Sequence, residues 1–503
     1  MKNYILGFVA LVALSTTACR KIETDGEPFI VEVPGTGGGG SATGKTVILK
    51  GTITKDTTLR AIDNNTISGF VYIESGATIT VEKGATVKGD YLAGEASTII
   101  IKRGARINAV GTADAPIVFT SSNPNPVSGD WGGIALLGKA SVNANNATYA
   151  TGYSATTHLY SPEGGYANTQ SQAVAGWGDA IAPAAVDNDN SGTMQYCRIE
   201  YAGNAYLPNQ EINSLTMAAV GSGTTIDHIQ VSFAKDDAYE WFGGTVNCRF
   251  LIAFKTQDDD FDTDNGYSGS VQFGIIVRDS LIADVSKSES FESDNDGTGT
   301  TSLPQTKAVF SNVSAFGPMA TINSVGNSNF LVSGGRVGGT CAQIRRGSSI
   351  SIYNSAFAGY ATGILIDAAL GNTDKAIADS TLRLRGNAYV RPLGSDDTKF
   401  KALGFTPANA TREAELSAWF LASGNRVITS AYENVFTRPF DYINPDWSPT
   451  GASPLLTASA VDFADAVIAG RPFITKVTFA GALAGGGEFS LWHKGWTKFN
   501  YPK

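Results

Sequence analysis

Cysteine is scarce in this chain, and its scarcity excludes a disulfide-stapled scaffold. The 503 residues contain four cysteines, one of which, Cys19, ends an apolar N-terminal stretch. The three that remain, Cys197, Cys248 and Cys341, can form at most one disulfide. Each lies in a strand-like segment, which favours the role of a buried packing thiol.

Positive charge is also in short supply. Lys and Arg number 37 against 46 Asp and Glu, so the formal net charge is −9 and the pI is near 5.0. Binding to nucleic acid without sequence preference requires a basic face. The charge balance therefore argues against a nucleic-acid partner.

Histidine is rare, and compact catalytic motifs are missing. The three histidines, His158, His228 and His493, are far apart in the sequence. The sequence contains no Ser-His-Asp arrangement, no Cys-His metal spacing and no phosphate-binding glycine loop. No motif therefore assigns a catalytic residue.

A long apolar run occurs only at the N-terminus. The chain begins MKNYILGFVALVALSTTAC, a secretory-signal pattern that is too short to span a membrane. A cysteine after small residues resembles the lipobox of bacterial lipoproteins, although Thr16 stands where an aliphatic residue is usual. We predict a signal peptide over residues 1–18 and lipid attachment at Cys19. A plain secretory signal is the alternative.

Glycine and β-prone residues are abundant instead. The 57 glycines, together with Thr, Val and Ile, favour many short strands joined by tight turns. The glycine-rich residues within 19–44 predict a flexible tether. Beyond residue 45 a Gly-Ala step recurs at Gly84 and Gly104, a spacing that fits one coil of a β-solenoid.

Similar strand-like segments follow one another further along the chain. They read MQYCRIEYAG, TIDHIQVSFA, NCRFLIAFK, VFSNVSAFG and ISIYNSAFAG. The aromatic residues Tyr201, Phe233 and Phe254 in three of these segments fit an inward stack that repeats from coil to coil. A β-sandwich would not reproduce similar segments in series. The sequence therefore predicts an all-β fold, a parallel β-helix over residues 45–370.

Two segments depart from this pattern. Residues 143–190 are a loop insertion rich in Asn, Gly, Ala and Tyr, and long loops of this kind are often functional. We predict that it binds ligand through Trp177, Tyr160 and Tyr166, because such rings stack on sugars; packing against the helix is the alternative. Residues 371–503 are predicted to hold the final coils and a mixed C-terminal cap.

Acidic residues are concentrated in residues 235–297, which hold fourteen Asp and Glu against five Lys and Arg. Three segments of this stretch align: DDAYEWFGG, DDDFDTDNG and SESFESDNDG. Strand alternation sends their aromatic residues, Tyr239, Phe261 and Phe291, to one side. The acidic neighbours would then form a ladder on the outer face with a spacing of about 4.8 Å.

A column of carboxylates needs compensating charge, because two of them about 5 Å apart repel by about 3 kcal/mol at an effective dielectric near 20. Calcium suits such a site, since it takes six to eight oxygen ligands. We predict that calcium is bound by Glu240, Asp260, Asp262, Asp264, Glu292 and Asp294. The alternative is a solvated face, or one neutralised by a stacked column of Lys235, Lys255 and Lys287.

Five segments resemble uncharacterised Bacteroidota lipoproteins with a right-handed parallel β-helix. They are DWGGIALLG, MQYCRIEYAG, DDAYEWFGGTVN, DDDFDTDNGYSG and the closing GWTKF. The resemblance covers most of the chain from about residue 45. It implies a pectate-lyase-like β-helix, outer-membrane anchoring and exposure at the cell surface, and it implies no reaction.

An enzyme, a ligand-binding module and an accessory protein that docks onto a partner all fit these features. A polysaccharide lyase would pair calcium with a basic residue, for which Lys235, Lys255 and Arg278 are candidates. An inverting glycoside hydrolase would use two carboxylates about 6.5–9.5 Å apart, such as Glu240 with Asp262 or Asp264. Fold alone does not establish catalysis. We expect instead a tethered module that binds calcium and either a glycan or a partner such as an outer-membrane transporter.

Overall fold

The computed structural model describes residues 29–33, 44–94, 96–143, 157–165, 173–207, 210–320, 326–330, 339–360, 362–391, 400–403 and 409–501. The predicted signal peptide and Cys19 lie outside these residues. Of the predicted tether, Phe29–Val33 forms strand β1, which pairs antiparallel with β2 (Thr46–Ile53) at the start of the coils.

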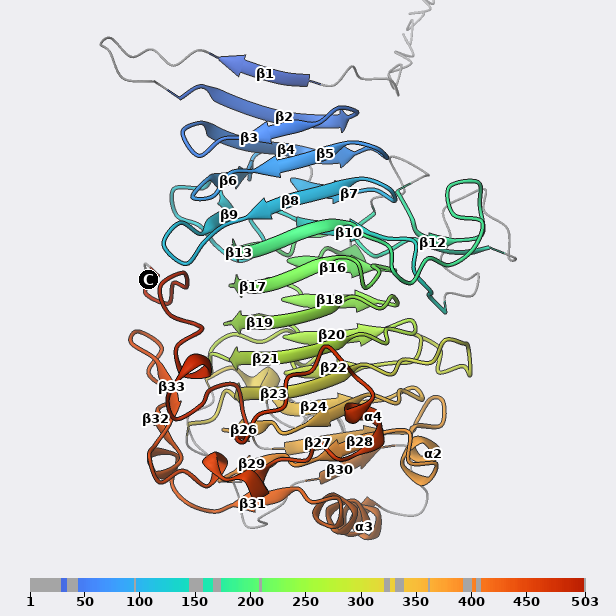
Figure 1. Ribbon diagram of the computed structural model, residues 1–503, viewed down its shortest axis with the longest axis vertical. Coiled ribbons are helices and arrows are strands. Elements are labelled where there is room, and N and C mark those ends of the chain that lie inside the picture. The colour runs from blue at the N-terminus through green and yellow to red at the C-terminus, as the bar shows by residue number, and fades with distance from the viewer. Residues whose placement is uncertain are drawn as a thin grey trace, which may run out of the picture.

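Short parallel strands stack on one another in three faces and form a right-handed parallel β-helix, as predicted (Figure 1). The first face contains β7 (Thr98–Ile101), β10 (Gly133–Leu137), β16 (Leu215–Ala218), β18 (Tyr239–Phe242), β20 (Phe261–Asp264), β22 (Phe291–Ser293), β24 (Thr340–Ile344), β27 (Thr362–Asp367) and β30 (Phe400–Leu403).

Several strands are long enough to serve two faces. The second face contains β3 (Thr57–Leu59), β5 (Thr78–Val81), β8 (Arg106–Val110), β25 (Ser351–Tyr353) and β28 (Arg383–Arg385). The third contains β6 (Thr86–Gly89), β9 (Ile117–Ser121), β26 (Ala356–Ala358), β29 (Ala388–Val390) and β31 (Arg426–Ile428). Five longer strands each span both of these faces: their first halves pair on the second face and their second halves on the third. They are β13 (Gly192–Glu200), β17 (Thr225–Ser232), β19 (Asn247–Phe254), β21 (Ser270–Val277) and β23 (Val309–Phe316). Strand β4 (Asn64–Ile73) joins the third face to the first.

The core runs along the inside of the coils. In β5 the buried residues are Ile79 and Val81, and they alternate with half-exposed threonines. Tyr239, Phe261 and Phe291 are fully buried inside, as their alignment predicts. Burying each such side chain stabilises the fold by about 1.5–3 kcal/mol.

Bulky residues occupy the corner between the second and third faces. Tyr196, His228, Phe250 and Phe273 have φ of 51°, 55°, 59° and 64°, a left-handed conformation that bends each strand. This conformation costs about 1–3 kcal/mol per residue. The four rings stack in series with centroid separations of 4.2, 4.4 and 5.2 Å. Stacking and burial of the rings offset the strain.

The C-terminal segment, residues 431–501, lies against this corner. Glutamine side chains of β17 and β21 bind the backbone of this segment both as donor and as acceptor, as a β-strand would. Gln230 Nε2 donates to the Lys498 carbonyl at 2.6 Å, and the Lys498 amide donates to Gln230 Oε1 at 2.9 Å. Gln272 and Thr475 exchange the same pair of bonds at 2.7 and 2.8 Å.

The region predicted to form the C-terminal cap therefore covers two different parts of the coils. Helix α3 (Asn409–Ala422) lies at the end of the coil stack, whereas the segment after it runs back along one side (Figure 1). It covers Tyr201 and Phe233, which stack on each other at 5.1 Å beneath Tyr501. The predicted inward stack of these aromatic residues is thus wrong: left-handed φ values of 62° and 58° turn Tyr201 and Phe233 toward the C-terminal segment.

The remaining elements lie on connections and in the C-terminal segment. They are β11 (His158–Tyr160), β12 (Ala175–Trp177), β14 (Ala205–Leu207), β15 (Gln210–Glu211), β32 (Phe436–Arg438), β33 (Asp446–Pro449), α2 (Thr373–Ala378), α4 (Ala466–Ala469) and 3₁₀ turns at Ser328–Phe330, Tyr432–Asn434, Pro454–Leu456, Ala458–Ala460 and Glu488–Ser490. None of the helices within the described ranges combines the length and hydropathy needed to cross a bilayer.

Docking of the C-terminal segment is expected to weaken in acid. His493 is 3% exposed, and burial, reinforced by Lys494, lowers its pKa to about 4. Unfolding restores an ordinary pKa near 6.5, so the unfolded chain binds the proton first as the pH falls. Stability should therefore fall between pH 6.5 and 4, by roughly 3 kcal/mol in total.

Denaturant unfolding of the wild type and His493→Gln at several pH values measures this effect. Carboxylates contribute equally to the pH dependence of unfolding in both proteins. The difference between the free energies of unfolding of the two proteins therefore reports the contribution of His493. Parallel pH profiles of the two proteins would contradict the assignment.

Candidate functional site

Stacked acidic side chains line the outer side of the first face. Glu240, Asp262 and Glu292 are in register on β18, β20 and β22, as the alignment predicts. They open into a cleft of about 490 Å³ that Asp264 and Asp294 also line. Five of the six predicted metal ligands therefore gather in one place.

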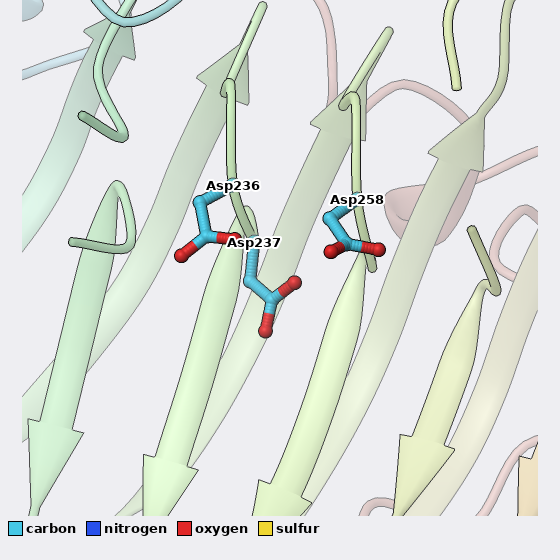
Figure 2. Close-up of side chains that lie close together, drawn as sticks. All are labelled: Asp236, Asp237 and Asp258. Atoms are coloured by element: carbon cyan, nitrogen blue, oxygen red, sulfur yellow. The ribbon is translucent and has the colours of Figure 1, made fainter. Parts of the chain in front are cut away.

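A second acidic row, which the sequence analysis missed, lies in the turns that lead into these strands. Asp236 and Asp237 precede β18, and Asp258 and Asp259 precede β20. Figure 2 shows Asp236, Asp237 and Asp258 side by side at the entrances to the two strands. The signal was present in the paired aspartates that open the segments DDAYEWFGG and DDDFDTDNG.

Residues of the two rows, together with Glu289, form three groups. Within each group, one carboxylate oxygen of every residue lies within 4.8 Å of one oxygen of each of the others. The groups are Asp236, Asp237 and Asp258; Asp237, Glu240 and Asp262; and Asp259, Glu289 and Glu292. Asp264 and Asp294 belong to none of them. A cation bound at 2.3–2.6 Å brings its ligand oxygens within about 5.2 Å of one another, so each group has the dimensions of a calcium site.

Arginines neutralise one end of the cleft. Arg345 forms ion pairs with Glu292 and, at 2.9 Å, with Asp294, and Arg346 lies 2.5 Å from Asp294. These arginines follow β24 and lie outside the acidic stretch of the sequence, so its local charge count did not reveal them. In the part of the chain that the structure describes, no Lys or Arg forms an ion pair with Asp236, Asp237, Glu240, Asp258 or Asp262.

Burial raises the pKa of the cleft carboxyls, and neighbouring carboxylates raise it further. The pKa of Asp258 rises to about 7, with Asp284 as the main acidic neighbour, and that of Asp264 rises to about 8, with Asp294. The pKa values of Asp237, Glu240 and Asp262 also rise well above the usual range for the same causes. The cleft therefore favours a bound cation or retained protons.

Asp260 does not join the ladder, which corrects its prediction as a metal ligand. It precedes β20 but is fully buried, with its Oδ2 2.9 Å from Nε of the equally buried Arg278. Arg278, a candidate base, also donates to the backbone carbonyls of Asp258 and Glu289. Both residues therefore support the turns that carry the cleft.

The three lysines that could have formed a stacked column do not lie together. Lys235 is exposed at the edge of the cleft. Lys255 lies away from it and forms an ion pair with Asp279 at 2.8 Å, and Lys287 does not line it either. The alternative of a stacked lysine column is therefore wrong, because the connections between coils differ in length.

The loop insertion contributes to the cleft through an acidic residue. Glu163 lines the cleft together with Glu211 of β15. Trp177 is half-buried and stacks on His158 at 4.0 Å, and Tyr160 is buried against Phe242 at 5.1 Å. Tyr166 lies outside the described residues. A ligand-binding role for these three aromatic residues stays a prediction.

The family model for the pectate-lyase-like β-helix domain matches residues 51–399. The chain belongs to this family. The match includes both acidic rows and most of the described coils of this pectate-lyase-like β-helix protein.

The other comparisons add little. No curated protein matches the sequence of this chain. Among solved structures, the crystal structure of the Dettilon tailspike protein (gp208) is 11% identical, with a TM-score of 0.23. The similarity covers 71% of this chain and 61% of the tailspike chain, so this chain spans less than two thirds of that protein.

Replacing Arg278 should unfold the turns of the cleft. Arg278→Met leaves the Asp260 carboxylate buried without its partner, which costs about 3–5 kcal/mol. Lys255→Met, which removes a partly exposed ion pair, should cost no more than about 1 kcal/mol. Denaturant titration of the two variants measures the contrast. Equal, small losses would show that the Arg278–Asp260 pair is not needed for stability.

Proposed function

We propose that this protein is a surface-tethered lipoprotein that binds calcium in the acidic cleft and uses it to hold a ligand or partner. One observation carries the proposal. Asp236, Asp237, Glu240, Asp258 and Asp262 crowd together without an ion pair to Lys or Arg among the described residues, while the neighbouring Glu292 and Asp294 are matched by arginines.

The donor chemistry favours calcium over other metals. The candidate ligands are carboxylate oxygens, with the amide of Asn213 beside them in the cleft wall. Hard oxygen ligands in an irregular arrangement suit calcium, whereas magnesium demands near-ideal octahedral geometry. The cleft groups contain no His or Cys, the ligands typical of zinc.

A bound cation would change what the cleft attracts. Without metal its carboxylates repel an anionic ligand, whereas calcium offers open coordination positions to carboxylates of a glycan or a partner protein. Arg345 and Arg346 at the same cleft add positive charge for the same class of ligand. The lipobox-like Cys19 supports attachment to the outer membrane, where a glycan or a transporter would be within reach.

Catalysis is the second candidate. A calcium-dependent lyase needs a base beside the metal, and Lys235 lines the same cleft as the acidic groups. A hydrolase that uses Glu240 and Asp262 fits less well. Their nearest oxygens lie within 4.8 Å, closer than the carboxyl separation of about 6.5–9.5 Å that inverting enzymes use.

Calcium should stabilise the mature protein, and Asp262→Asn should reduce that stabilisation. A ligand that binds only the folded state adds about 2.7 kcal/mol at a hundredfold excess over its dissociation constant. Thermal unfolding in calcium and in excess chelator measures the shift. Glu211→Gln is the matched control, since Glu211 lines the cleft but belongs to none of the three groups of residues. An unfolding temperature that is the same in calcium and chelator would refute the proposal.

Anionic glycans separate binding from catalysis. Incubation of the calcium-loaded protein with uronate-containing polysaccharides should show calcium-dependent retention without new unsaturated chain ends. Ultraviolet absorbance detects such ends. If they appear and Lys235→Ala abolishes them, the protein is a lyase.

A further inference from the structure

Asp237 belongs to two of the three carboxylate groups. One of its oxygens lies within 4.8 Å of oxygens of Asp236 and Asp258, and one lies within the same distance of oxygens of Glu240 and Asp262. A carboxylate has two oxygens and accepts from several directions, so it can bind two cations at once. Paired metal ions in proteins lie about 3.5–4 Å apart.

We infer that the cleft holds two calcium ions bridged by the carboxylate of Asp237. The first ion is bound by Asp236, Asp237 and Asp258, and the second by Asp237, Glu240 and Asp262. This inference rests on the proposed calcium binding and extends it to a paired site.

The surroundings of Asp237 fix it in a bridging position. The residue is 7% exposed, and its Oδ1 accepts a hydrogen bond from the backbone amide of Asp259 at 2.8 Å. Its own amide donates to Asn213 Oδ1 at 3.2 Å, and the Asn213 side chain donates to Glu240. Asn213 therefore orients two ligands of the second ion relative to each other.

Among the described residues, buried polar atoms without a partner occur in the second carboxylate group and in the strand residue that pairs with Glu240. Asp262 Oδ1 is buried and has no hydrogen-bond partner among the described residues. Thr216 is 1% exposed, and its hydroxyl is also without a partner in this part of the chain. Thr216 pairs in register with Glu240, so its side chain points to the same side. Buried polar groups are rarely left unpaired, and a bound ion with its waters would satisfy both.

The third carboxylate group differs in its counter-charge. Glu292 of this group forms an ion pair with Arg345, and buried Arg278 donates to the backbone of Glu289. Asp259 accepts a hydrogen bond from the Glu289 amide. Glu292 already has an arginine partner and this group does not contain Asp237, so the inference is limited to two ions.

Calcium stoichiometry tests the paired site. Equilibrium dialysis of the mature full-length protein should give two calcium ions per chain. Asp258→Asn and Asp262→Asn should each leave one tightly bound ion. Asp237→Asn should weaken both ions at least tenfold, because it removes a ligand from each. Glu211→Gln should still bind two, and circular dichroism should show that all variants are folded.

The outcomes separate the inference from the proposed function. One calcium ion in the wild type would overturn the paired site and leave calcium binding intact. Two ions of which Asp237→Asn weakens only one would overturn the bridge. No bound calcium in the folded wild type would overturn both the inference and the proposed function.

Discussion

In-register stacking of the coils is the constraint on which the rest of this structure depends. Parallel backbone hydrogen bonds place each residue directly over its equivalent in the next coil, about 4.8 Å away. On the inside this puts Tyr239, Phe261 and Phe291 in one continuous core. On the outside the same register places Glu240 beside Asp262 and Asp262 beside Glu292, where their charges repel. The stabilising column of aromatic residues inside and the destabilising column of carboxylates outside therefore have the same cause, the in-register stacking of the coils.

The large aliphatic and aromatic core allows the fold to tolerate this repulsion, and the corners extend that core. Left-handed residues turn aromatic rings outward on one side, where they would expose a large apolar surface. The C-terminal segment covers that surface and is bound by Gln230 and Gln272. The coils are therefore closed by helix α3 at the end and by the C-terminal segment along the side, which leaves the first face free to carry the cleft.

The cleft is electrostatically uneven along the coil axis. Where Arg345 and Arg346 follow β24, the carboxylates Glu292 and Asp294 are neutralised within the protein. Two coils before Glu292, no such residue compensates Asp237 and Glu240 among the described parts of the chain. An acidic surface with solvated charges would not need this difference. Buried carboxylates without counter-charge are what a cation stabilises, and the adjoining arginines favour an anionic group that contacts both.

The sequence by itself determined the coil architecture, the inward aromatic column and the register of Glu240, Asp262 and Glu292, because strand alternation and repeated segments are local properties. Only the tertiary structure decided which charges meet. Asp260 turned inward to Arg278, the arginines after β24 reached Glu292 and Asp294, and Glu163 arrived from the loop insertion. The C-terminal segment also returned along the side of the coils, where a cap over their end was predicted. These contacts join residues far apart in the sequence through turns of unequal length, and no local pattern encodes the direction in which such turns carry a side chain.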